Sequence, residues 1–379
     1  MSYFLSEEQE LIRKAAKEFA ETEIKPKAKE LDETHEFPWD WVNECAELGF
    51  LGVSIPEKYG GAGADCLSEM LIIEEIAKYS GSLALIIDAH TSLGCMPLLH
   101  DGTEEQKQKY LIPAAKGEKL MSFGLTEPGA GSDAGGTQTT AVLDGDEWVL
   151  NGTKCWITNI GAAKTYIVTA KTDLDKGNRG ISAFIVEAGT PGFEVGKPER
   201  KMGLNNSNTG DLYFKNCRIR KENLLGKLNK GFPVFLRGLD EGRLAISAMA
   251  VGMAQGALEL ATVYAKERVQ FGKPISSFQG ISFKLAEMAI NIEAARTMLY
   301  NAARLRDAGL PYSKEAAMVK AFSSEMCVDA CDKSLQIHGG NGYSKELEIE
   351  RYYRDAKLLT IGEGTSEINR MVIANHLLA

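Results

Sequence analysis

The chain has 379 residues, of which 44% are apolar and 25% charged, and its formal net charge is −9. This composition is that of an ordinary globular protein with chain enough for two or three domains. The acidic balance, with both signs of charge interspersed, disfavours a nucleic-acid partner, which would select for a basic stripe. No apolar run is expected to span a bilayer, and the N-terminus has no signal or transit pattern, so we expect no membrane insertion and a cytoplasmic location.

The seven cysteines are scattered, and only Cys327 and Cys331 lie one helical turn apart. No Cys-x-x-Cys pair or histidine cluster accompanies them, so the sequence predicts no metal site. Buried, reduced thiols are the interpretation that fits this pattern.

The N-terminal third has the pattern of a helical domain. Ser6 with Gln9 and Thr103 with Gln106 form capping-box patterns, each ahead of apolar residues at helical spacing. Pro26 should end or kink the first helix. Further helices are predicted over residues 39–48, 68–79, 82–99 and 103–115.

Short β-branched runs bounded by turn dipeptides then replace the helical pattern. The dipeptides Asp144-Gly145 and Asn151-Gly152 predict two successive hairpins. Because no long helical pattern interrupts the strands, we expect an antiparallel barrel or sandwich. No Gly-x-Gly-x-x-Gly follows a strand, which disfavours a dinucleotide bound in the Rossmann manner. Strands are predicted over residues 139–143, 147–150, 165–171, 181–187 and 212–219.

Helical patterning returns in the last third of the chain. Long helices are predicted over residues 232–268, 278–308 and 313–338, followed by a shorter helix and a terminal one. Long antiparallel helices with short links form a bundle. The predicted fold is α+β and multi-domain: an N-terminal all-α domain (1–120), a central β domain (121–230) and a C-terminal helix bundle (231–379).

The segment Thr-Ile-Gly-Glu-Gly-Thr-Ser-Glu-Ile-Asn-Arg, which begins at residue 360, is where we expect the chemistry. Glu363 stands between Gly362 and Gly364. Two glycines beside a carboxylate permit positive φ and a close approach of a ligand to the backbone. Thr365 or the serine after it can cap the terminal helix. By itself, the segment is equally a Gly-rich turn whose glutamate complements a helix dipole.

Two segments of the β domain offer hydroxyl groups and an aromatic ring. The loop Phe-Gly-Leu-Thr-Glu-Pro-Gly-Ala-Gly-Ser-Asp, which begins at residue 123, suits hydrogen bonding to a flat polar ring and a phosphate-bearing tail. Trp156 and Thr158 alternate on a strand and should share one face, where an indole can stack on a heteroaromatic ring. A surface turn and a core tryptophan are the simpler interpretations.

Two predicted helices end in polar, glycine-containing segments: Arg-Val-Gln-Phe-Gly-Lys-Pro-Ile from residue 268, and Gln-Ile-His-Gly-Gly-Asn-Gly from residue 336. Glycines allow the backbone to approach a diphosphate closely. Each segment alone would be an ordinary helix C-terminus.

These segments, in this order and over the whole length, resemble the acyl-CoA dehydrogenase family, and most of all its short-chain, butyryl-CoA-type bacterial members. The Thr-Glu-Pro-x-Ala-Gly-Ser-Asp and Glu-Gly-Thr-Ser-Glu-Ile motifs are specific. The resemblance implies tightly bound FAD, an acyl-CoA substrate and an electron-transferring flavoprotein as electron acceptor. It also implies a homotetramer built as a dimer of dimers.

The resemblance further assigns roles to individual residues. Glu363 matches the base that takes the α-proton while the β-hydrogen leaves as hydride to flavin N5, and its backbone N–H with a ribityl hydroxyl would bind the thioester oxygen. Burial should raise the pKa of Glu363 toward the operating pH. Substrate contacts match Ser132, Arg243 and Gly364. FAD contacts match Leu125, Thr126, Trp156, Thr158, Arg268, Phe271, Gln279, Gln336, Gly339, Gly340, Thr365 and Glu367, of which Gln336, Gly339 and Gly340 would serve the FAD of a neighbouring subunit.

One departure from the family pattern and one near-match bear on the pocket. Gly362 stands where many relatives carry an aromatic residue, so the acyl-chain preference stays open. Glu241 lies near the position of the base in some branched-chain relatives, but Gly242 occupies that position. Glu363 therefore remains the expected base.

Asp88 is the second departure, because it lies in an apolar helical stretch where the family usually has a small neutral residue. A buried carboxylate is costly without a partner, so His90, a backbone group or solvent should satisfy it. The functional interpretation is a second acid–base group, suited to an alicyclic acyl-CoA such as a cyclohexane- or cyclohexenecarboxyl-CoA. The sequence also leaves open an enoyl-CoA reductase running in reverse and a non-catalytic CoA-binding protein of the same fold.

Overall fold

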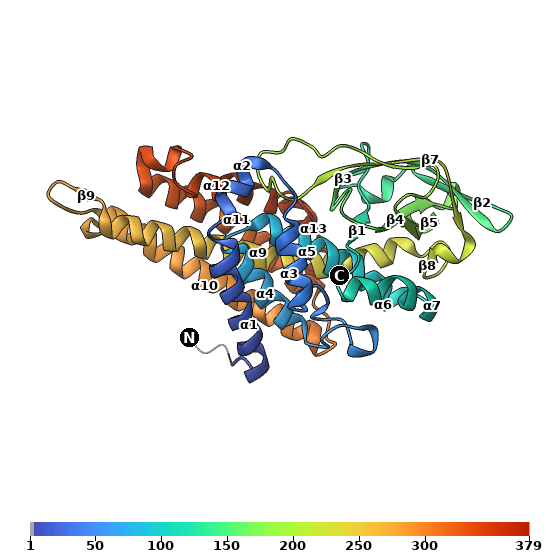
Figure 1. Cartoon of the computed structure of the whole chain (residues 1–379), viewed down its shortest axis with the longest axis horizontal. Helices are drawn as coiled ribbons and strands as arrows, with labels where there is room; N and C mark the ends of the chain where they lie inside the picture. The colour runs from blue at the N-terminus through green and yellow to red at the C-terminus, as the bar shows by residue number, and fades with distance from the viewer. Residues whose placement is uncertain (1–3, 379) are drawn as a thin grey trace.

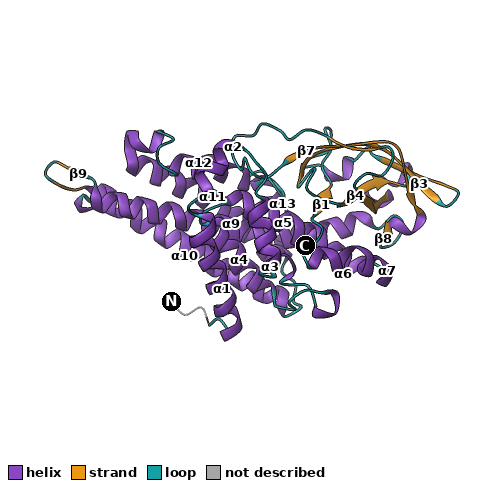
Figure 2. Cartoon of the chain, viewed as in Figure 1, coloured by secondary structure: helices purple, strands orange, loops and turns teal. Residues whose placement is uncertain are grey.

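The computed structural model describes residues 4–378 and has a helical body with a β-sheet at one end (Figures 1 and 2). The order of helical, β and helical segments confirms the predicted fold class. The N-terminal helices are α1 (Glu7–Phe19), α2 (Ala28–Thr34), α3 (Trp39–Glu47), α4 (Cys66–Ala77), α5 (Gly81–His90), α6 (Met96–Asp101), α7 (Glu104–Gln106) and α8 (Ile112–Ala115).

Both predicted capping boxes are present. The Ser6 hydroxyl accepts from the Gln9 N–H at 3.1 Å, and the Gln9 side chain accepts from the Ser6 N–H at 2.9 Å. Thr103 and Gln106 form the same reciprocal pair at the start of α7. The helical run that begins with α1 ends in a π-helical turn just before Pro26, as the proline predicts.

The predicted helix over residues 82–99 is continuous but not regular. A π-helical turn, Thr91–Cys95, joins α5 to α6. Such π-bulges are rare in proteins, and those that occur often lie at functional sites. The serine and threonine of this turn lie in the core, next to a buried carboxylate described below.

One eight-stranded sheet forms the middle of the chain, in the order β6-β7-β3-β2-β4-β5-β8, with β1 paired to β4. Most neighbours are antiparallel, as predicted, but β1 and β2 each run parallel to β4, so the sheet is mixed. The strands are β1 (Met121–Gly124), β2 (Thr140–Asp144), β3 (Glu147–Thr158), β4 (Thr165–Lys171), β5 (Ile181–Glu187), β6 (Phe193–Val195), β7 (Thr209–Arg220) and β8 (Leu224–Leu225).

The second predicted hairpin is wrong. Asp144-Gly145 does turn the chain between β2 and β3, but β3 then runs straight through Gly152. Its pairing with β7 shifts register between Leu150 and Gly152, which marks a bulge. A Cβ on Gly152 would lie 2.3 Å from the Thr139 hydroxyl, so this glycine permits close packing rather than a turn.

The C-terminal part is a bundle built around α9 (Gly231–Glu267), which packs against α4, α10 and α11. Two helical stretches, Gly81–Asp101 and Gly231–Glu267, are long and apolar enough to cross a membrane, contrary to the sequence expectation. Their most apolar windows are 94% and 78% buried, which is the pattern of core helices. The other elements are β9 (Val269–Gln270), β10 (Lys273–Pro274), α10 (Gln279–Asp307), α11 (Ser313–His338), α12 (Ile349–Leu359) and α13 (Ser366–Leu378).

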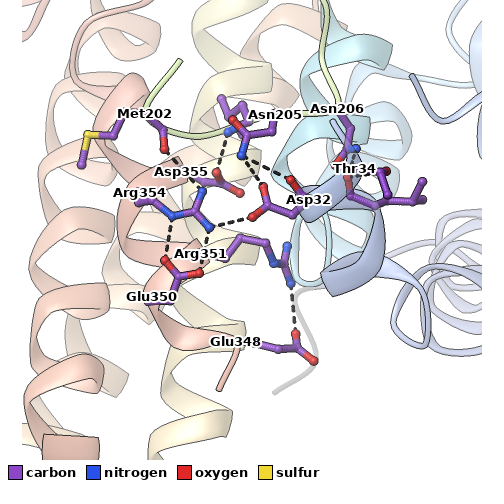
Figure 3. Close-up of polar contacts among 12 residues, drawn as sticks. Asp32, Thr34, Met202, Asn205, Asn206, Glu348, Glu350, Arg351, Arg354 and Asp355 are labelled. Carbon is purple, nitrogen blue, oxygen red and sulfur yellow. Dashed lines mark hydrogen bonds and ion pairs between the residues drawn. The ribbon is translucent and has the colours of Figure 1, made fainter. Parts of the chain in front are cut away.

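A polar junction joins all three parts of the chain (Figure 3). Arg354 on α12 donates to Asp32 of α2 at 2.6 Å and to the Met202 carbonyl at 3.3 Å. Buried Asp355 accepts from the Leu204 N–H at 2.5 Å, and burial raises its pKa to about 6. The loop that leads into β7 is thereby held between an N-terminal and a C-terminal helix.

A second polar contact joins the helical part to the sheet, near the segments that carry Asp88 and Trp156. The Asn159 amide, just after β3, donates to the Ile86 carbonyl on α5 at 3.1 Å and to the Met121 carbonyl at 3.2 Å. Helix α5 and strands β1 and β3 are therefore fixed relative to one another. This arrangement positions Asp88 and Trp156, which belong to different domains.

Candidate active site around Glu363

The turn between α12 and α13 presents Glu363 in a strained conformation. Glu363 has φ of 53° and Gly364 has φ of 94°. A non-glycine residue in this left-handed region costs on the order of 1–3 kcal/mol and persists only where its surroundings hold it. The Gly364 carbonyl accepts from Lys320 Nζ at 2.5 Å and from the Asn369 amide at 2.9 Å. Thr365 caps α13, because its hydroxyl accepts from the Ile368 N–H at 3.3 Å.

The Glu363 carboxylate points into the protein. Among residues 4–378, its Oε2 has no hydrogen-bond partner, and this atom is buried. Gly242 of α9 lies directly beside it, since a Cβ built on this glycine would be 1.8 Å from Oε2. Glu241 instead accepts from Arg306 at 3.1 Å. The residue beside Glu363 is therefore Gly242, and the neighbouring glutamate belongs to a separate ion pair.

Asp88 lies next to Glu363, and among the residues described its carboxyl is satisfied neither by His90, nor by a backbone group, nor by solvent. Its side chain is fully buried, and within the described chain neither carboxyl oxygen has a hydrogen-bond partner of good geometry. His90 is engaged elsewhere: its ring contacts the Ala114 carbonyl at 3.2 Å and accepts from the Met121 N–H at 3.0 Å. The Glu363 carboxyl is the group close enough to share a proton with Asp88.

Two adjacent buried carboxyl groups cannot both ionise cheaply. Burial, and then the Glu363 charge, raise the pKa of Asp88 well above its usual range. Burial also raises the pKa of Glu363, while the adjacent Asp88 carboxyl and the charges of Lys320 and Arg243 oppose this rise. Of the two, Asp88 therefore holds a proton more readily and Glu363 ionises more readily. Burial in turn lowers the pKa of Lys320 to about 8.

The predicted flavin-binding residues of the β domain lie together. The Cys155 N–H donates to the Thr126 carbonyl at 2.9 Å, so the segment after β1 runs beside β3. Trp156 is 62% exposed at a bulge with φ of 60°, whereas Ile157 is 2% exposed. Trp156 and Thr158 therefore flank an inward-facing residue, and in the part of the chain described here no hydrogen bond engages the Thr126 or Thr158 hydroxyl.

A buried ion pair supports this segment. Lys154 Nζ donates to Glu127 at 2.7 Å, to the Leu125 carbonyl at 3.1 Å and to the Thr169 hydroxyl at 2.9 Å. Although burial opposes ionisation, Lys154 and several hydrogen bonds lower the pKa of Glu127 to about 2. Burial lowers the pKa of Lys154 to about 8. The pair fixes the backbone that leads into the predicted flavin-binding loop.

The other predicted FAD residues lie at the opposite end of the molecule. Arg268, Phe271 and Gln279 surround the β9–β10 hairpin, which projects at the left of Figure 1, whereas the sheet lies at the right. The Phe271 side chain is 93% exposed. The α11 end joins them, because Asn341 donates to the Tyr264 hydroxyl of α9 at 2.9 Å. This group also contains Gln336, Gly339 and Gly340, all exposed.

Three predicted residues remain. Ser132 is exposed on the loop after β1, and Glu367 is exposed in the first turn of α13. Arg243 is buried near Gly364, with one guanidinium nitrogen 3.8 Å from the position that a Cβ would take on that glycine. Its Nη1 pairs with Asp240, and within the described residues its Nε has no partner. The chain therefore gathers Asp88, Arg243, Glu363 and Gly364 in one place.

A cavity of about 1020 Å³ lies elsewhere, between α1, α4, α9 and α10. Arg13 and Arg296 on its wall are paired with Glu75 and Glu74. Glu363 does not line it. Its charged, paired wall does not suit an acyl chain.

Three family models match successive parts of the chain. They are the N-terminal, middle and C-terminal domains of acyl-CoA dehydrogenase, over residues 6–118, 122–217 and 229–378. The chain belongs to the acyl-CoA dehydrogenase family. It is therefore an oxidoreductase, and a non-catalytic CoA-binding protein is set aside.

Relatives of this acyl-CoA dehydrogenase match it end to end. A probable acyl-CoA dehydrogenase, YngJ, of Bacillus subtilis is 53% identical over 379 residues and is covered completely, as is this chain. A short-chain specific acyl-CoA dehydrogenase of Clostridium acetobutylicum is 48% identical, with both chains covered completely. The caffeyl-CoA reductase–Etf complex subunit CarC of Acetobacterium woodii is 47% identical over 99% of each chain.

Solved structures agree with the fold. Butyryl-CoA dehydrogenase from Megasphaera elsdenii has a TM-score of 0.98 at 45% identity and covers both chains completely. A structure described in work on the electron transferring flavoprotein of Acidaminococcus fermentans and flavin-based electron bifurcation has the same TM-score, 47% identity and complete coverage of both chains. An acyl-CoA dehydrogenase complexed with FAD from Bacillus anthracis has a TM-score of 0.94 at 39% identity, over 99% of this chain and 67% of that one.

The sequence analysis did not predict the role that three residues play around Glu363 in this acyl-CoA dehydrogenase. Lys320, Gly242 and Asn369 hold or accommodate the Glu363 turn. Lys320 was detectable in principle, because it interrupts the buried face of α11 between Val319 and Ala321. Gly242 and Asn369 carry no comparable local signal.

Proposed function

We propose that this acyl-CoA dehydrogenase removes the α- and β-hydrogens of a short-chain acyl-CoA to give the trans-2-enoyl-CoA, with Glu363 as the base. The observation that carries the proposal is the buried, unpartnered Oε2 of Glu363 on a strained residue between two glycines. An uncompensated carboxylate in such a position is costly and is typical of a functional group.

The surroundings of Glu363 suit proton abstraction. Burial raises its pKa and so makes it a stronger base than a free glutamate. The charges of Lys320 and Arg243, with the adjacent Asp88 carboxyl, oppose that rise in pKa and favour the ionised form. Within residues 4–378, its backbone N–H makes no hydrogen bond, which leaves this donor free for the thioester oxygen of an enolate-like transition state.

FAD is the proposed cofactor, and bound FAD would accept the β-hydrogen as hydride. The residues present fit this group, since Trp156 exposes most of its ring and the Thr126 and Thr158 hydroxyls are free to bind a polar ring edge. Leu125 and Thr126 would bind the flavin edge, Trp156 would cover the ring, and Thr158 would donate to N5. Thr365 and Glu367 would contact the AMP half, and Ser132 and Arg243 would line the CoA channel.

The proposed assembly is a homotetramer, arranged as a dimer of dimers. The two groups of predicted FAD residues lie at opposite ends of one chain, which supports a site shared between subunits. In this proposal Arg268, Phe271 and Gln279 reach the diphosphate and adenine region, and they come from the neighbouring subunit together with Gln336, Gly339 and Gly340. The domain boundaries at residues 120 and 230, and a cytoplasmic location, stay predictions.

An electron-transferring flavoprotein is the proposed electron acceptor. The names of a relative in an Etf complex and of a structure from work on such a flavoprotein support this partner. Reductases occur among the relatives at 46–48% identity, so the reverse direction, enoyl-CoA reduction, is the alternative for the physiological reaction. The short-chain and butyryl-CoA names of other relatives favour oxidation of a short acyl chain.

The decisive test is Glu363→Gln, which keeps the size of the side chain but removes the base. Loss of a positioned base costs about 10²–10⁴-fold in rate, so anaerobic flavin bleaching by butyryl-CoA should slow by that factor or more while FAD stays bound. The exposed Glu346→Gln serves as the matched control and should bleach normally. Wild-type bleaching by Glu363→Gln would remove Glu363 from this role.

A second candidate function rests on Asp88. A carboxyl group beside the base is suited to an alicyclic acyl-CoA, in which a proton leaves a ring carbon remote from the thioester. Wild type and Asp88→Ser should then differ most with cyclohexane- or cyclohexenecarboxyl-CoA and least with butyryl-CoA in the bleaching assay. If Asp88→Ser leaves all three rates unchanged, the alicyclic proposal fails and Asp88 is structural.

A further inference from the structure

Asp88 is one member of a line of buried polar side chains that leads away from Glu363. Helices α4 and α5 are almost wholly buried, yet they and the π-helical turn after α5 carry Glu69, Asp88 and Ser92 at no more than 4% exposure. Burying these polar groups in an apolar core costs free energy unless they are hydrogen-bonded, so their presence together calls for a functional or structural reason.

The members of this line are neighbours in the core. Asp88 and Ser92 lie four residues apart on one helical run, and the Asp88 carboxyl adjoins both Ser92 and the Glu363 carboxyl without a hydrogen bond of good geometry to either. Ser92 Oγ donates to Glu69 Oε1 at 3.3 Å. The other carboxyl oxygen of Glu69 accepts from the Ser54 hydroxyl at 2.6 Å, and Ser54 retains 9% exposure. The line therefore runs from the buried Oε2 of Glu363 to a residue that touches solvent.

We propose that Asp88, Ser92 and Glu69 form a proton pathway, which carries the proton taken up by Glu363 through α5 and α4 to the surface at Ser54. This inference rests on the proposed role of Glu363 as base. Oε2 of Glu363 is buried beside Asp88, so a proton placed on this oxygen leaves most directly through the Asp88 carboxyl.

The transfer balances without any change of electrons. In the resting state Asp88 carries a proton and Glu363 and Glu69 are anions. After Glu363 takes the substrate α-proton, Asp88 gives its proton to Ser92 Oγ while the Ser92 hydroxyl gives its own to Glu69. Glu363 then passes the substrate proton to Asp88. One net proton has moved from Glu363 to Glu69, and Glu69 releases it to water beside Ser54.

The charges around Glu69, at the end of the pathway away from Glu363, suit a group that accepts a proton and later releases it. Burial raises the pKa of Glu69, whereas Ser54, Thr91 and the Arg306 guanidinium oppose the rise and the Glu241 charge adds to it. The Thr91 hydroxyl lies 2.6 Å from Glu69 Oε1 and holds this carboxyl in place. Glu69 can therefore change protonation state without leaving its hydrogen bonds.

The test separates oxidation of the substrate from release of the proton. FAD-loaded enzyme is mixed anaerobically with butyryl-CoA in weak buffer that contains a pH indicator. Flavin absorbance then reports the chemical step, and the indicator reports proton release, with one proton expected per flavin bleached. The quantity compared is the ratio of the release rate to the bleaching rate.

In Ser92→Ala and in Glu69→Gln, loss of a positioned proton carrier should lower this ratio by about 10²-fold. Ser92→Thr, which keeps a hydroxyl, should restore it. Ser334→Ala is the matched control, since Ser334 is a buried serine that donates only to the Ala257 carbonyl, at 2.7 Å. Two variants are used so that a folding defect in one leaves the test intact.

A wild-type ratio in both Ser92→Ala and Glu69→Gln would overturn the pathway. Failure of the proposed function has a different signature, because wild-type enzyme would then not bleach with any acyl-CoA, or Glu363→Gln would bleach normally. Infrared spectroscopy gives a readout without turnover: a protonated-carboxyl band should be present in the resting enzyme and absent in Asp88→Asn. Persistence of that band in Asp88→Asn would also contradict the proposal.

Discussion

At the scale of single residues, the Glu363 carboxylate depends on the absence of a side chain at position 242. The backbone of α9 passes so close to Oε2 that a methyl group would overlap it. Lys320 and Asn369 hold the Gly364 carbonyl from the other side, so the carboxylate cannot simply move away. The carboxylate of the proposed base is therefore positioned by the space beside Gly242 as well as by the hydrogen bonds that hold its turn.

Gly242→Ala should displace the carboxylate while leaving α9 intact. The new Cβ would lie 1.8 Å from Oε2. A misplacement of about 1 Å can cost about 10²-fold in rate, and we expect this loss in anaerobic bleaching by butyryl-CoA. Gly238→Ala is the control on the same helix, because its nearest contact would be an ordinary 3.6 Å, to Phe123. Equal bleaching rates in the two variants would show that the space beside Gly242 does not position the Glu363 carboxylate.

At the scale of elements, the Lys154–Glu127 pair braces three strands and the loop that follows β1. Lys154 lies on β3 and also contacts Thr169 of β4, while Glu127 accepts from the backbone N–H groups of Gln138 and Thr139 ahead of β2. Both partners are buried. Removal of one partner would leave an uncompensated charge inside the sheet.

Lys154→Met should therefore destabilise the protein by about 3–5 kcal/mol, as for other broken buried pairs, and release bound FAD. Combining it with Glu127→Gln should recover much of this loss, since no buried charge remains. Chemical unfolding and the ratio of flavin to protein absorbance provide the measurements. Lys215→Met, an exposed lysine on β7, is the control. A double variant no more stable than Lys154→Met would show that the charge is not the cause.

At the scale of the whole molecule, the predicted cofactor residues divide between two ends. The sheet carries Trp156 and Thr158, whereas the hairpin after α9 and the end of α11 carry Phe271 and Gln336. Exposed aromatic residues such as Phe271 are typical of surfaces that meet a partner. In the proposed assembly, a second copy of the chain would complete both halves.

Gln336→Ala should weaken FAD retention and the oligomer together, because the residue would serve both. Sedimentation at several protein concentrations measures assembly, and flavin absorbance after gel filtration measures retention. The exposed Gln108→Ala, whose side chain donates to Glu104, is the control. Normal behaviour of Gln336→Ala in both assays would mean that the shared site lies elsewhere.

The sequence by itself determined those features that depend on near neighbours along the chain. Capping pairs such as Ser6 with Gln9, the strand Thr165–Lys171 and the helix Ser313–His338 were predictable, since caps and periodic apolar residues act within a few positions. The specific motifs were also sufficient to predict the family.

Only the tertiary structure decided which distant side chains meet. Gly152 has the local pattern of a turn residue, but packing against Thr139 makes it a bulge within β3. Asp88 lies beside Glu363, and Lys320 binds the Gly364 carbonyl, because α5, α11 and the turn before α13 pack around α9. Local periodicity gives the buried face of each helix, whereas contacts between faces depend on how the helices pack together.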